Sequence, residues 1–250
     1  GDGDLLNGGA GNDLASFGTA SAAVTVDMST GRVRVAGLTT FDTLVSIERV
    51  SASSYADKMY GGDGHDDLNG QAGNDTLAGR AGNDTLRGNL GEDKLYGGLG
   101  NDQLSGEDGN DQLYGEDADD RLSGGNGNDL IHGNSGADTL WGNSGNDTLN
   151  GGMGVDRLYG DAGNDELTGG AGADQFIIVR DGTTSRDVIT DFVNNFDTII
   201  LSGFNVTSFA GLAAVATVQN GDDLLLTFGN QSLLITNTSL ASLADDLSFA

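Results

Sequence analysis

The chain has 250 residues, enough for one or two domains, and no apolar run approaches the roughly 18 residues of a membrane-spanning helix. It carries 38 Asp and Glu against 11 Lys and Arg, and the resulting formal charge of -27 argues against nucleic acid or membrane insertion. Glycine accounts for 43 residues while proline and cysteine are absent, which excludes collagen, disulfides and thiolate metal sites.

The start of the chain is predicted to contain one glycine turn and several strands. Residues 8–13 form a Gly-rich turn that ends in Asp13, and residues 24–28 and 33–35 alternate like strands. The chain begins at Gly1 without methionine, inside what resembles a damaged repeat, and we expect no signal peptide within these residues. We therefore expect the chain to be a piece of a longer protein.

Residues 43–51 and 52–60 precede a regular nine-residue repeat that starts at Gly61, and they match its spacing. In these two segments Asp57 and Glu48 fall where the repeat has Asp. We expect irregular rungs here, with Asp57 paired to Asp75.

A nine-residue unit runs without a register slip from Gly61 to Ile177, thirteen times in all. Position 1 is Gly and position 6 is Asp in every unit. Position 8 is Leu except at Ile131 and Phe176, and position 4 is Gly except at Ala118. Such self-similarity at a fixed period is the signature of a solenoid.

Each position of the unit has a physical interpretation. Gly at positions 1 and 4 permits positive φ and close backbone approach. Asn or Asp at position 5 tolerates left-handed geometry, so positions 1–6 are predicted to form a turn. The other three residues form a minimal strand with one inward apolar side chain. One unit cannot bury its leucine alone, but stacked units can. The prediction is an all-β, two-sheet parallel β-roll with 18 residues in each coil.

After residue 177 the glycine period stops. Residues 187–192 and 197–201 are predicted to be strands, and 209–218 a short helix. Residues 224–228 and 232–236 are predicted to form a hairpin. We expect three parts: irregular rungs over 1–60, the regular array over 61–177, and a β-rich cap over 178–250.

The units, such as 79–87 (Gly-Arg-Ala-Gly-Asn-Asp-Thr-Leu-Arg), resemble the calcium-binding repeat of the RTX family, the hemolysin-type nonapeptide. The resemblance implies a parallel β-roll in which Ca²⁺ lies between turns one coil apart. The earlier turn would supply the carbonyls of positions 2 and 4 and its Asp. The later turn would supply the carbonyls of positions 1 and 3 and its own Asp.

Carried onto this chain, the resemblance implies many backbone and side-chain ligands. The implied metal-site residues are Asp13, Asp57, Gly62, Gly64, Asp66, Gly73, Asp75, Gly79, Ala81, Gly82, Asp84, Gly88, Leu90, Gly91, Asp93, Gly97, Gly98, Leu99, Gly100, Asp102, Gly106, Asp108, Gly109, Asp111, Asp120, Gly124, Gly127, Asp129, Gly133, Ser135, Gly136, Asp138, Gly142, Ser144, Gly145, Asp147, Gly151, Met153, Gly154, Asp156, Gly160, Ala162, Asp165, Gly169, Ala171 and Asp174. Ala118 and Val155, at positions 4 and 5 of their units, are expected to weaken or distort their sites.

Thirteen units, each paired with the unit two further along, give eleven pairs and hence about eleven or more Ca²⁺ ions. That charge nearly balances -27, so we expect folding to be coupled to calcium binding. The resemblance also implies export by the type I secretion machinery through an uncleaved C-terminal tail. We therefore expect a bacterial protein that is secreted or displayed at the cell surface.

No catalytic motif occurs, and the two histidines, His65 and His132, lie in different units, so we expect no enzymatic activity in this chain. A glycan- or surface-binding module is the alternative, because position 9 places Tyr96, Tyr114 and His132 on successive coils. Extracellular polysaccharide is the partner in that alternative. Ice binding is disfavoured because the outward threonine row is broken by Lys94 and other residues.

Overall fold

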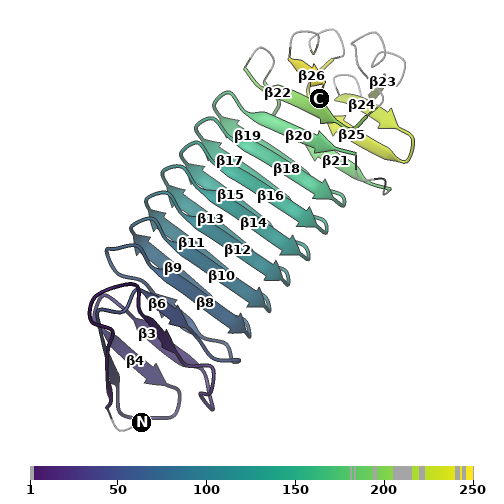
Figure 1. Cartoon of the computed structure of the whole chain (residues 1–250). Helices are drawn as coiled ribbons and strands as arrows, with labels where there is room; N and C mark the ends of the chain where they lie inside the picture. Colours follow the sequence, from purple (N-terminus) through teal and green to yellow (C-terminus); the bar gives the residue numbers. More distant parts are fainter. Residues whose placement is uncertain are drawn as a thin grey trace.

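A computed structural model describes residues 3–180, 182, 184–193, 196–204, 216–219, 223–239, 243 and 246–249. The described residues form a long solenoid of two sheets, with the ends of the chain at opposite ends of the molecule (Figure 1). No helix among them is long and apolar enough to cross a bilayer. The predicted all-β, two-sheet parallel architecture is confirmed.

The two sheets face each other, and from β6 to β22 successive strands of the chain alternate between them. The 15-stranded sheet, called sheet A, contains in spatial order β1 (Leu5–Asn7), β5 (Asp42–Val45), β4 (Arg32–Val35), β3 (Val24–Asp27), β7 (Lys58–Tyr60), β9 (Thr76–Ala81), β11 (Lys94–Leu99), β13 (Gln112–Asp117), β15 (Leu130–Ser135), β17 (Thr148–Met153), β19 (Glu166–Ala171), β21 (Arg186–Ile189), β25 (Gln231–Ile235), β24 (Asp223–Phe228) and β23 (Ala216–Gln219). The 11-stranded sheet, called sheet B, contains β2 (Leu14–Ser16), β6 (Arg49–Ser51), β8 (Asp67–Ala72), β10 (Thr85–Leu90), β12 (Gln103–Asp108), β14 (Arg121–Asn126), β16 (Thr139–Ser144), β18 (Arg157–Ala162), β20 (Gln175–Val179), β22 (Thr198–Ser202) and β26 (Leu247–Phe249).

The pairing register gives the predicted coil of 18 residues. Leu86 lies beside Leu68 on one side and Leu104 on the other. Position 8 of every regular unit is at most 2% exposed, so the apolar side chains of the two sheets form one thin core. Burying a leucine contributes roughly 1.5–3 kcal/mol, which makes this column the main apolar stabilisation of the array.

The strands are longer than predicted, and of the positions predicted to be left-handed only position 4 is confirmed. Strand β8 spans six residues, from position 7 of one unit to position 3 of the next, so only positions 4–6 turn. Positive φ occurs at positions 2 and 4, as at Gln71 (76°) and Gly73 (118°), and not at position 1 or at Asn74 in position 5. Position 1 must be Gly for a different reason: a Cβ there would collide with the position-6 carboxylate of its own unit.

The N-terminal rungs contain an antiparallel insertion. Strand β3 pairs antiparallel with β4, and β4 with β5, before β3 joins β7 in the parallel ladder. The backward register is confirmed, because Val50 pairs with Leu68 and Met59 with Leu77. The glycine turn before β2 is a complete unit, with positive φ at Gly9 and Gly11.

The C-terminal region continues both sheets and then reverses direction. The strand predictions near residues 187 and 197 are confirmed by β21 and β22, which extend the two parallel ladders. The predicted hairpin is β24 and β25, which pair antiparallel across Gly229 and Asn230. The predicted helix is wrong at 216–218, which lie in β23, and its residues 209–215 lie outside the described part of the chain.

The left-handed residue at position 2 gives a stability prediction. Glu107 has φ of 77°, which costs a non-glycine residue about 1–2 kcal/mol. Glycine removes that cost, but it also destabilises the fold by about 0.5–1 kcal/mol because it gives the unfolded chain more conformational freedom. We expect Glu107→Gly to raise the free energy of unfolding by about 0.5–1 kcal/mol in urea at saturating calcium. Glu107→Gln, which removes the charge but keeps the side chain, should not show this gain.

Candidate metal sites

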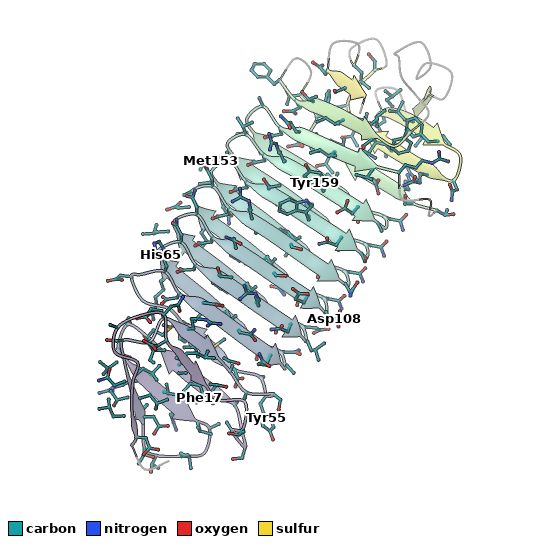
Figure 2. The ribbon with its side chains drawn as sticks, in the orientation of Figure 1. Phe17, Tyr55, His65, Asp108, Met153 and Tyr159 are labelled. Carbon is teal, nitrogen blue, oxygen red and sulfur yellow. The ribbon has the colours of Figure 1, made fainter. Side chains whose placement is uncertain are left out.

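The aspartates at position 6 form two columns, one along each edge of the solenoid where the chain turns between the sheets. Asp75 precedes a strand of sheet A and Asp84 precedes a strand of sheet B, and the columns continue at 18-residue steps. Figure 2 shows His65 and Met153 at one of these edges and Asp108 at the other. The column aspartates of the regular array are at most 8% exposed, which is unusual for carboxylates.

Backbone hydrogen bonds link neighbouring aspartates within each column. The N–H of Asp138 donates to Oδ1 of Asp156 at 2.8 Å, and the N–H of Asp156 donates to Oδ1 of Asp174 at 3.0 Å. The same bond joins consecutive members from Asp57 and Asp66 onward. Each bond holds a carboxylate in the gap between two stacked turns.

The second carboxylate oxygen, Oδ2, is buried and accepts no hydrogen bond in most of the array. Burying such an acceptor without a partner costs about 1–3 kcal/mol, and more for a charged group. The described aspartates with this orphaned oxygen include Asp13, Asp75, Asp84, Asp93, Asp102, Asp111, Asp120, Asp129, Asp138, Asp147, Asp156 and Asp174. A regular series of orphaned anionic oxygens indicates positions for cations.

Backbone carbonyls converge on the same gaps. In the pair of turns at 133–138 and 151–156, the carbonyls of Asn134 and Gly136 point toward the later turn, where they would meet a Cβ on Gly152 or Gly154. From the later turn, the carbonyl oxygen of Gly151 points back and lies 2.5 Å from the place of a Cβ on Gly133. The Met153 carbonyl also points back and accepts the N–H of Gly136 at 2.8 Å.

Burial is the largest cause of the raised pKa of Asp75, Asp93, Asp120 and most other carboxyls of the regular array. The pKa of Asp75 and of Asp120 rises to about 8, although each accepts a backbone hydrogen bond that acts in the opposite direction. Neighbouring carboxylates add to the rise, as Asp93 and Asp57 do for the pKa of Asp75. The ionised forms therefore need a counter-charge inside the gaps.

This donor set fits a hard divalent cation. Carboxylate and carbonyl oxygens are the ligands of Ca²⁺ and Mg²⁺, and Ca²⁺ accepts the larger number of them. Among the described residues, no three or more His, Cys, Asp or Glu side chains cluster to hold a metal by themselves. Carbonyl oxygens would therefore complete each coordination sphere.

A second ladder follows position 5 and explains its asparagines. The side-chain Oδ1 of Asn128 accepts the N–H of Asn146 at 2.8 Å, and Asn146 accepts from Asn164 at 2.9 Å. Val155 at this position cannot accept such a bond. His65 replaces asparagine and accepts the N–H of Asn83 through Nδ1 at 2.7 Å. The sequence interpretation of position 5 as left-handed was wrong, and this hydrogen bond is the reason for its composition.

Two predicted ligands have other partners at the start of the columns. The N–H of Asp57 donates to Oδ1 of Asp75 at 2.7 Å, in line with the expected pairing of the two residues. The Asp57 carboxylate itself accepts from the N–H of Val24 at 2.6 Å and from the Ser53 hydroxyl. Oδ2 of Asp66 accepts the N–H of Gly62 at 2.6 Å. At Asp57 and Asp66, protein groups donate to carboxylate oxygens whose counterparts further along the array accept no hydrogen bond.

Sequence reasoning missed members at the end of each column. The N–H of Asp165 donates to Asp187 at 3.4 Å, and that of Asp174 donates to Asp197 at 3.0 Å. These spacings are 22 and 23 residues instead of 18, so the strict period hid them. The signal that could have found them is Asp followed two residues later by Ile189 or Ile199, the arrangement of positions 6 and 8.

The unit with Ala118 keeps the column intact. Ala118 has φ of 83°, whereas the position-4 glycines from Gly73 onward range from 115° to 158°. The hydrogen bonds from Asp102 to Asp120 and from Asp120 to Asp138 are 2.7 and 2.8 Å. The backbone thus accommodates alanine by a change of dihedral angle without breaking the ladder.

A family model described as the RTX calcium-binding nonapeptide repeat matches seven overlapping stretches: 46–77, 70–104, 78–113, 96–131, 114–149, 123–158 and 150–177. Together they span more than half of the chain. No curated protein sequence matches the chain.

Solved structures with related repeats also match. The extracellular lipase LipA of Serratia marcescens is 20% identical over 84% of this chain and 44% of the lipase, with a TM-score of 0.43. The AlgE6R3 and AlgE6R2 subunits of the Azotobacter vinelandii mannuronan C5-epimerase are 28% and 27% identical, cover 54% and 59% of this chain and 80% and 92% of their own, and have TM-scores of 0.26 and 0.30. The chain therefore spans less than half of the lipase it matches.

Proposed function

The chain belongs to the RTX calcium-binding nonapeptide repeat family, and we propose that it is a module that folds when it binds extracellular calcium and so supports type I secretion of a larger bacterial protein. As a repeat domain it is structural and calcium-binding, not catalytic. The observation that carries the proposal is the orphaned, buried Oδ2 atom repeated along both columns.

In each proposed site, two turns one coil apart share one Ca²⁺. For the pair described above, the ligands would be the carbonyls of Asn134 and Gly136 with Asp138, and the carbonyls of Gly151 and Met153 with Asp156. The directions of these carbonyls support this set. We extend it to the other pairs of units, with about eleven or more ions in total. At Asp57 and Asp66 the carboxylate already accepts backbone N–H groups, of Val24 and Gly62 respectively.

The apo chain should not hold this fold at neutral pH. Neighbouring carboxylates in a column lie about one coil spacing apart, roughly 5 Å, where two charges repel by roughly 3 kcal/mol at an effective dielectric of 20. The thin leucine core offers little stabilisation to offset the total repulsion between carboxylates in the two columns. Binding energy would then become folding energy, as in other small metal-dependent domains.

The calcium requirement explains how secretion and folding can be ordered. Extracellular calcium modules bind at roughly 10⁻⁴–10⁻³ M, a concentration that a cytosol does not supply. The chain would stay unfolded and transportable before export and fold outside the cell. The predicted secretion tail, residues 243–250, includes residues 244–245 and 250, which lie outside the described part of the chain.

Far-ultraviolet circular dichroism tests this proposal on metal-free protein titrated with Ca²⁺, with Mg²⁺ as the control ion. We expect a cooperative transition from coil to β-structure with Ca²⁺ alone, at roughly 10⁻⁴–10⁻³ M. A spectrum already rich in β-structure without Ca²⁺ would overturn coupled folding and leave calcium as an accessory.

A second proposed function is adhesion to a glycan through the outer faces of the sheets. The rings of Tyr96 and Tyr114 stack at 5.1 Å, and those of Tyr114 and His132 at 5.3 Å. Trp141 stacks on Tyr159 on the other sheet at 5.6 Å. The stacking covers both faces of the Tyr114 ring, so sugar rings could stack only at the ends of this ladder. Loss of glycan binding in Tyr96→Ala would support this function.

A further inference from the structure

Positive charge is concentrated on the outer surfaces of the strands, away from the acidic turns. Ten of the 11 Lys and Arg residues lie in strands, whereas the aspartate columns lie in turns. Half of these ten are exposed on the first coils of sheet A, between β4 and β11: Arg32, Arg34, Lys58, Arg80 and Lys94. In a chain of charge -27, this is a local reversal of sign.

The strand register places three of these cations in one row with threonines between them. Arg34 pairs with Thr25, Thr25 with Lys58, Lys58 with Thr76, and Thr76 with Lys94. Cations therefore recur at every second strand, about 10 Å apart, with a hydroxyl between them. Among the described residues, neither Lys58 nor Lys94 forms an ion pair.

A parallel row beside the cations carries aromatic rings. Tyr60 pairs with Ala78 and Ala78 with Tyr96, so a small residue separates the two rings. The Arg80 guanidinium lies over the Tyr60 ring at 5.4 Å and is held by Asp27 at 2.9 Å. Among the described rings Tyr96 stacks on Tyr114, and its strand neighbour on the other side is the small residue Ala78. A groove of about 420 Å³ runs from Arg80 past Tyr96 to Asn134 on β15, and its acidic residues, Glu116 and Asp117, lie on β13, beyond the last cation of the row on β11.

We propose that these two rows, from β4 to β11, form a track that binds an acidic polysaccharide. This inference rests on the second proposed function, glycan adhesion, and specifies the chemistry of the glycan. An extended pyranose chain with 1,4-diequatorial linkages advances by about one strand spacing per ring and turns successive rings over. A uronate chain would then present carboxylates to the track at every second strand, where the cations lie. The ring face of Tyr96 and the threonine hydroxyls would contact the sugar rings between them.

Charge density favours this partner over other polyanions. Duplex DNA carries one negative charge per about 1.7 Å. Its repulsion by the acidic protein would therefore exceed the attraction of three widely spaced cations. A bilayer of acidic lipids would likewise face the aspartate edges on both sides of the track. A polymer with sparse charge at twice the strand spacing matches the row of Arg34, Lys58 and Lys94.

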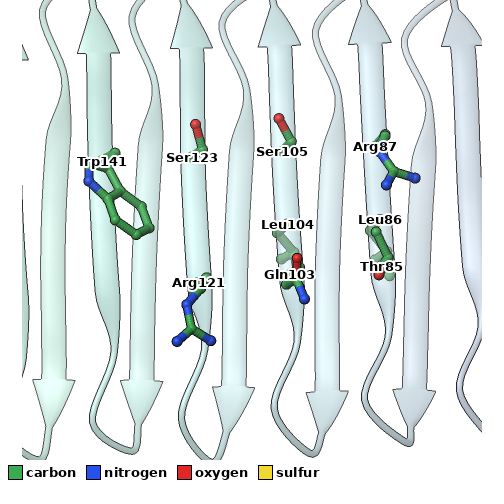
Figure 3. Close-up of a pocket in the computed structure, with 9 residues that line it drawn as sticks. All are labelled: Thr85, Leu86, Arg87, Gln103, Leu104, Ser105, Arg121, Ser123 and Trp141. Carbon is green, nitrogen blue, oxygen red and sulfur yellow. The ribbon is translucent and has the colours of Figure 1, made fainter.

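Sheet B supplies a matched control surface. Its outer face also has a groove, of about 210 Å³, lined by Arg87, Arg121, Ser123 and Trp141 (Figure 3). There Arg87 is neutralised by Asp67 at 2.7 Å, and Asp67 also pairs with Arg49 at 3.2 Å. Arg121 and Arg157 occupy position 7 of sheet B, as Lys58 and Lys94 do on sheet A. Replacing either pair removes the same charge from the same kind of position.

Isothermal titration calorimetry of the calcium-loaded protein tests the track with three probes: a short oligouronate, a neutral oligosaccharide of the same linkage, and duplex DNA. We expect the oligouronate to bind, and Lys58→Gln with Lys94→Gln to weaken it roughly fivefold to tenfold through two lost ion pairs. Arg121→Gln with Arg157→Gln should change the affinity less than twofold. Circular dichroism confirms that each variant folds with calcium.

Each outcome separates the inference from the function on which it rests. Equal losses of oligouronate affinity in the two double variants would overturn the track, because binding would then depend only on overall charge. DNA binding as strong as oligouronate binding would overturn it for the same reason. Binding of the neutral sugar with equal affinity would overturn the acidic specificity but keep glycan adhesion. No binding of either sugar by the folded protein would overturn both, while the calcium-dependent fold would stand.

Discussion

Replacing Asp93 with asparagine is expected to remove two calcium ions from the folded protein. Asp93 faces Asp75 in the preceding coil and Asp111 in the following one through N–H to Oδ1 bonds of 2.7 and 2.8 Å. Asparagine keeps the acceptor for that bond but places an amide group where the orphaned Oδ2 lies. At calcium a hundredfold above Kd, each lost site would lower the free energy of unfolding by about 2.7 kcal/mol, or about 5 kcal/mol for the two.

The measurement is ion stoichiometry by equilibrium dialysis with radioactive calcium, together with urea unfolding. Glu92→Gln is the matched control, because Glu92 is the exposed neighbour in the same turn and its substitution removes the same charge. The sign should also reverse without calcium, since Asp93→Asn then removes a repelling charge from the column. Two variants with the same ion count and stability would contradict the proposed role of position 6.

The solenoid could be predicted because two of its requirements are visible in single residues. A leucine at every ninth position fixes both the core and the coil, and the pairing of Leu86 with Leu68 and Leu104 follows from that period. An aspartate at every position 6 likewise fixes the columns, because the side chain must reach the gap between turns in each coil. Leucine at position 8 and aspartate at position 6 each serve a single function, so the sequence repeat is enough to predict that function.

The backbone strain at position 2 could not be predicted, because the residues there vary. Gln71, Glu107 and Asp161 all have positive φ, although none is a residue that would signal it as glycine does. Position 1, always glycine, suggested left-handed geometry, but its glycine avoids a collision instead. An invariant residue shows that a constraint exists without showing which constraint it is.

The ends of the columns were hidden for another reason, the insertion of a few residues. The strands β21 and β22 keep the order of Asp and buried Ile found in the repeat, but longer loops shift Asp187 and Asp197 out of period. At the other end, the antiparallel β3–β4 pair interrupts sheet A while the coil pattern resumes on both sides. Stacking tolerates such insertions because each coil needs only its neighbours.

Acid is expected to substitute in part for calcium. Burial raises the pKa of Asp111, Asp147 and Asp156 to about 7, and of Asp75 and Asp120 to about 8, from an ordinary value of 3.8. The folded apo chain therefore binds protons more tightly than the unfolded chain. Its stability is greatest below about pH 4 and is lost as pH rises toward about 8, because the unfolded state ionises first.

Circular dichroism of metal-free protein at a series of pH values measures this effect. We expect β-structure to grow as pH falls from about 8 to about 5, since each extra proton held by the folded state adds about 1.4 kcal/mol per pH unit. With calcium present the dependence should run the other way, because the metal needs ionised carboxylates and the calcium midpoint should rise in acid. Light scattering must show a monomeric species, since the net charge falls in the same range. A metal-free chain that stays unfolded throughout would show that protonation removes the repulsion without supplying enough cohesion, and that calcium contributes cross-links between coils which neutral carboxyls cannot replace.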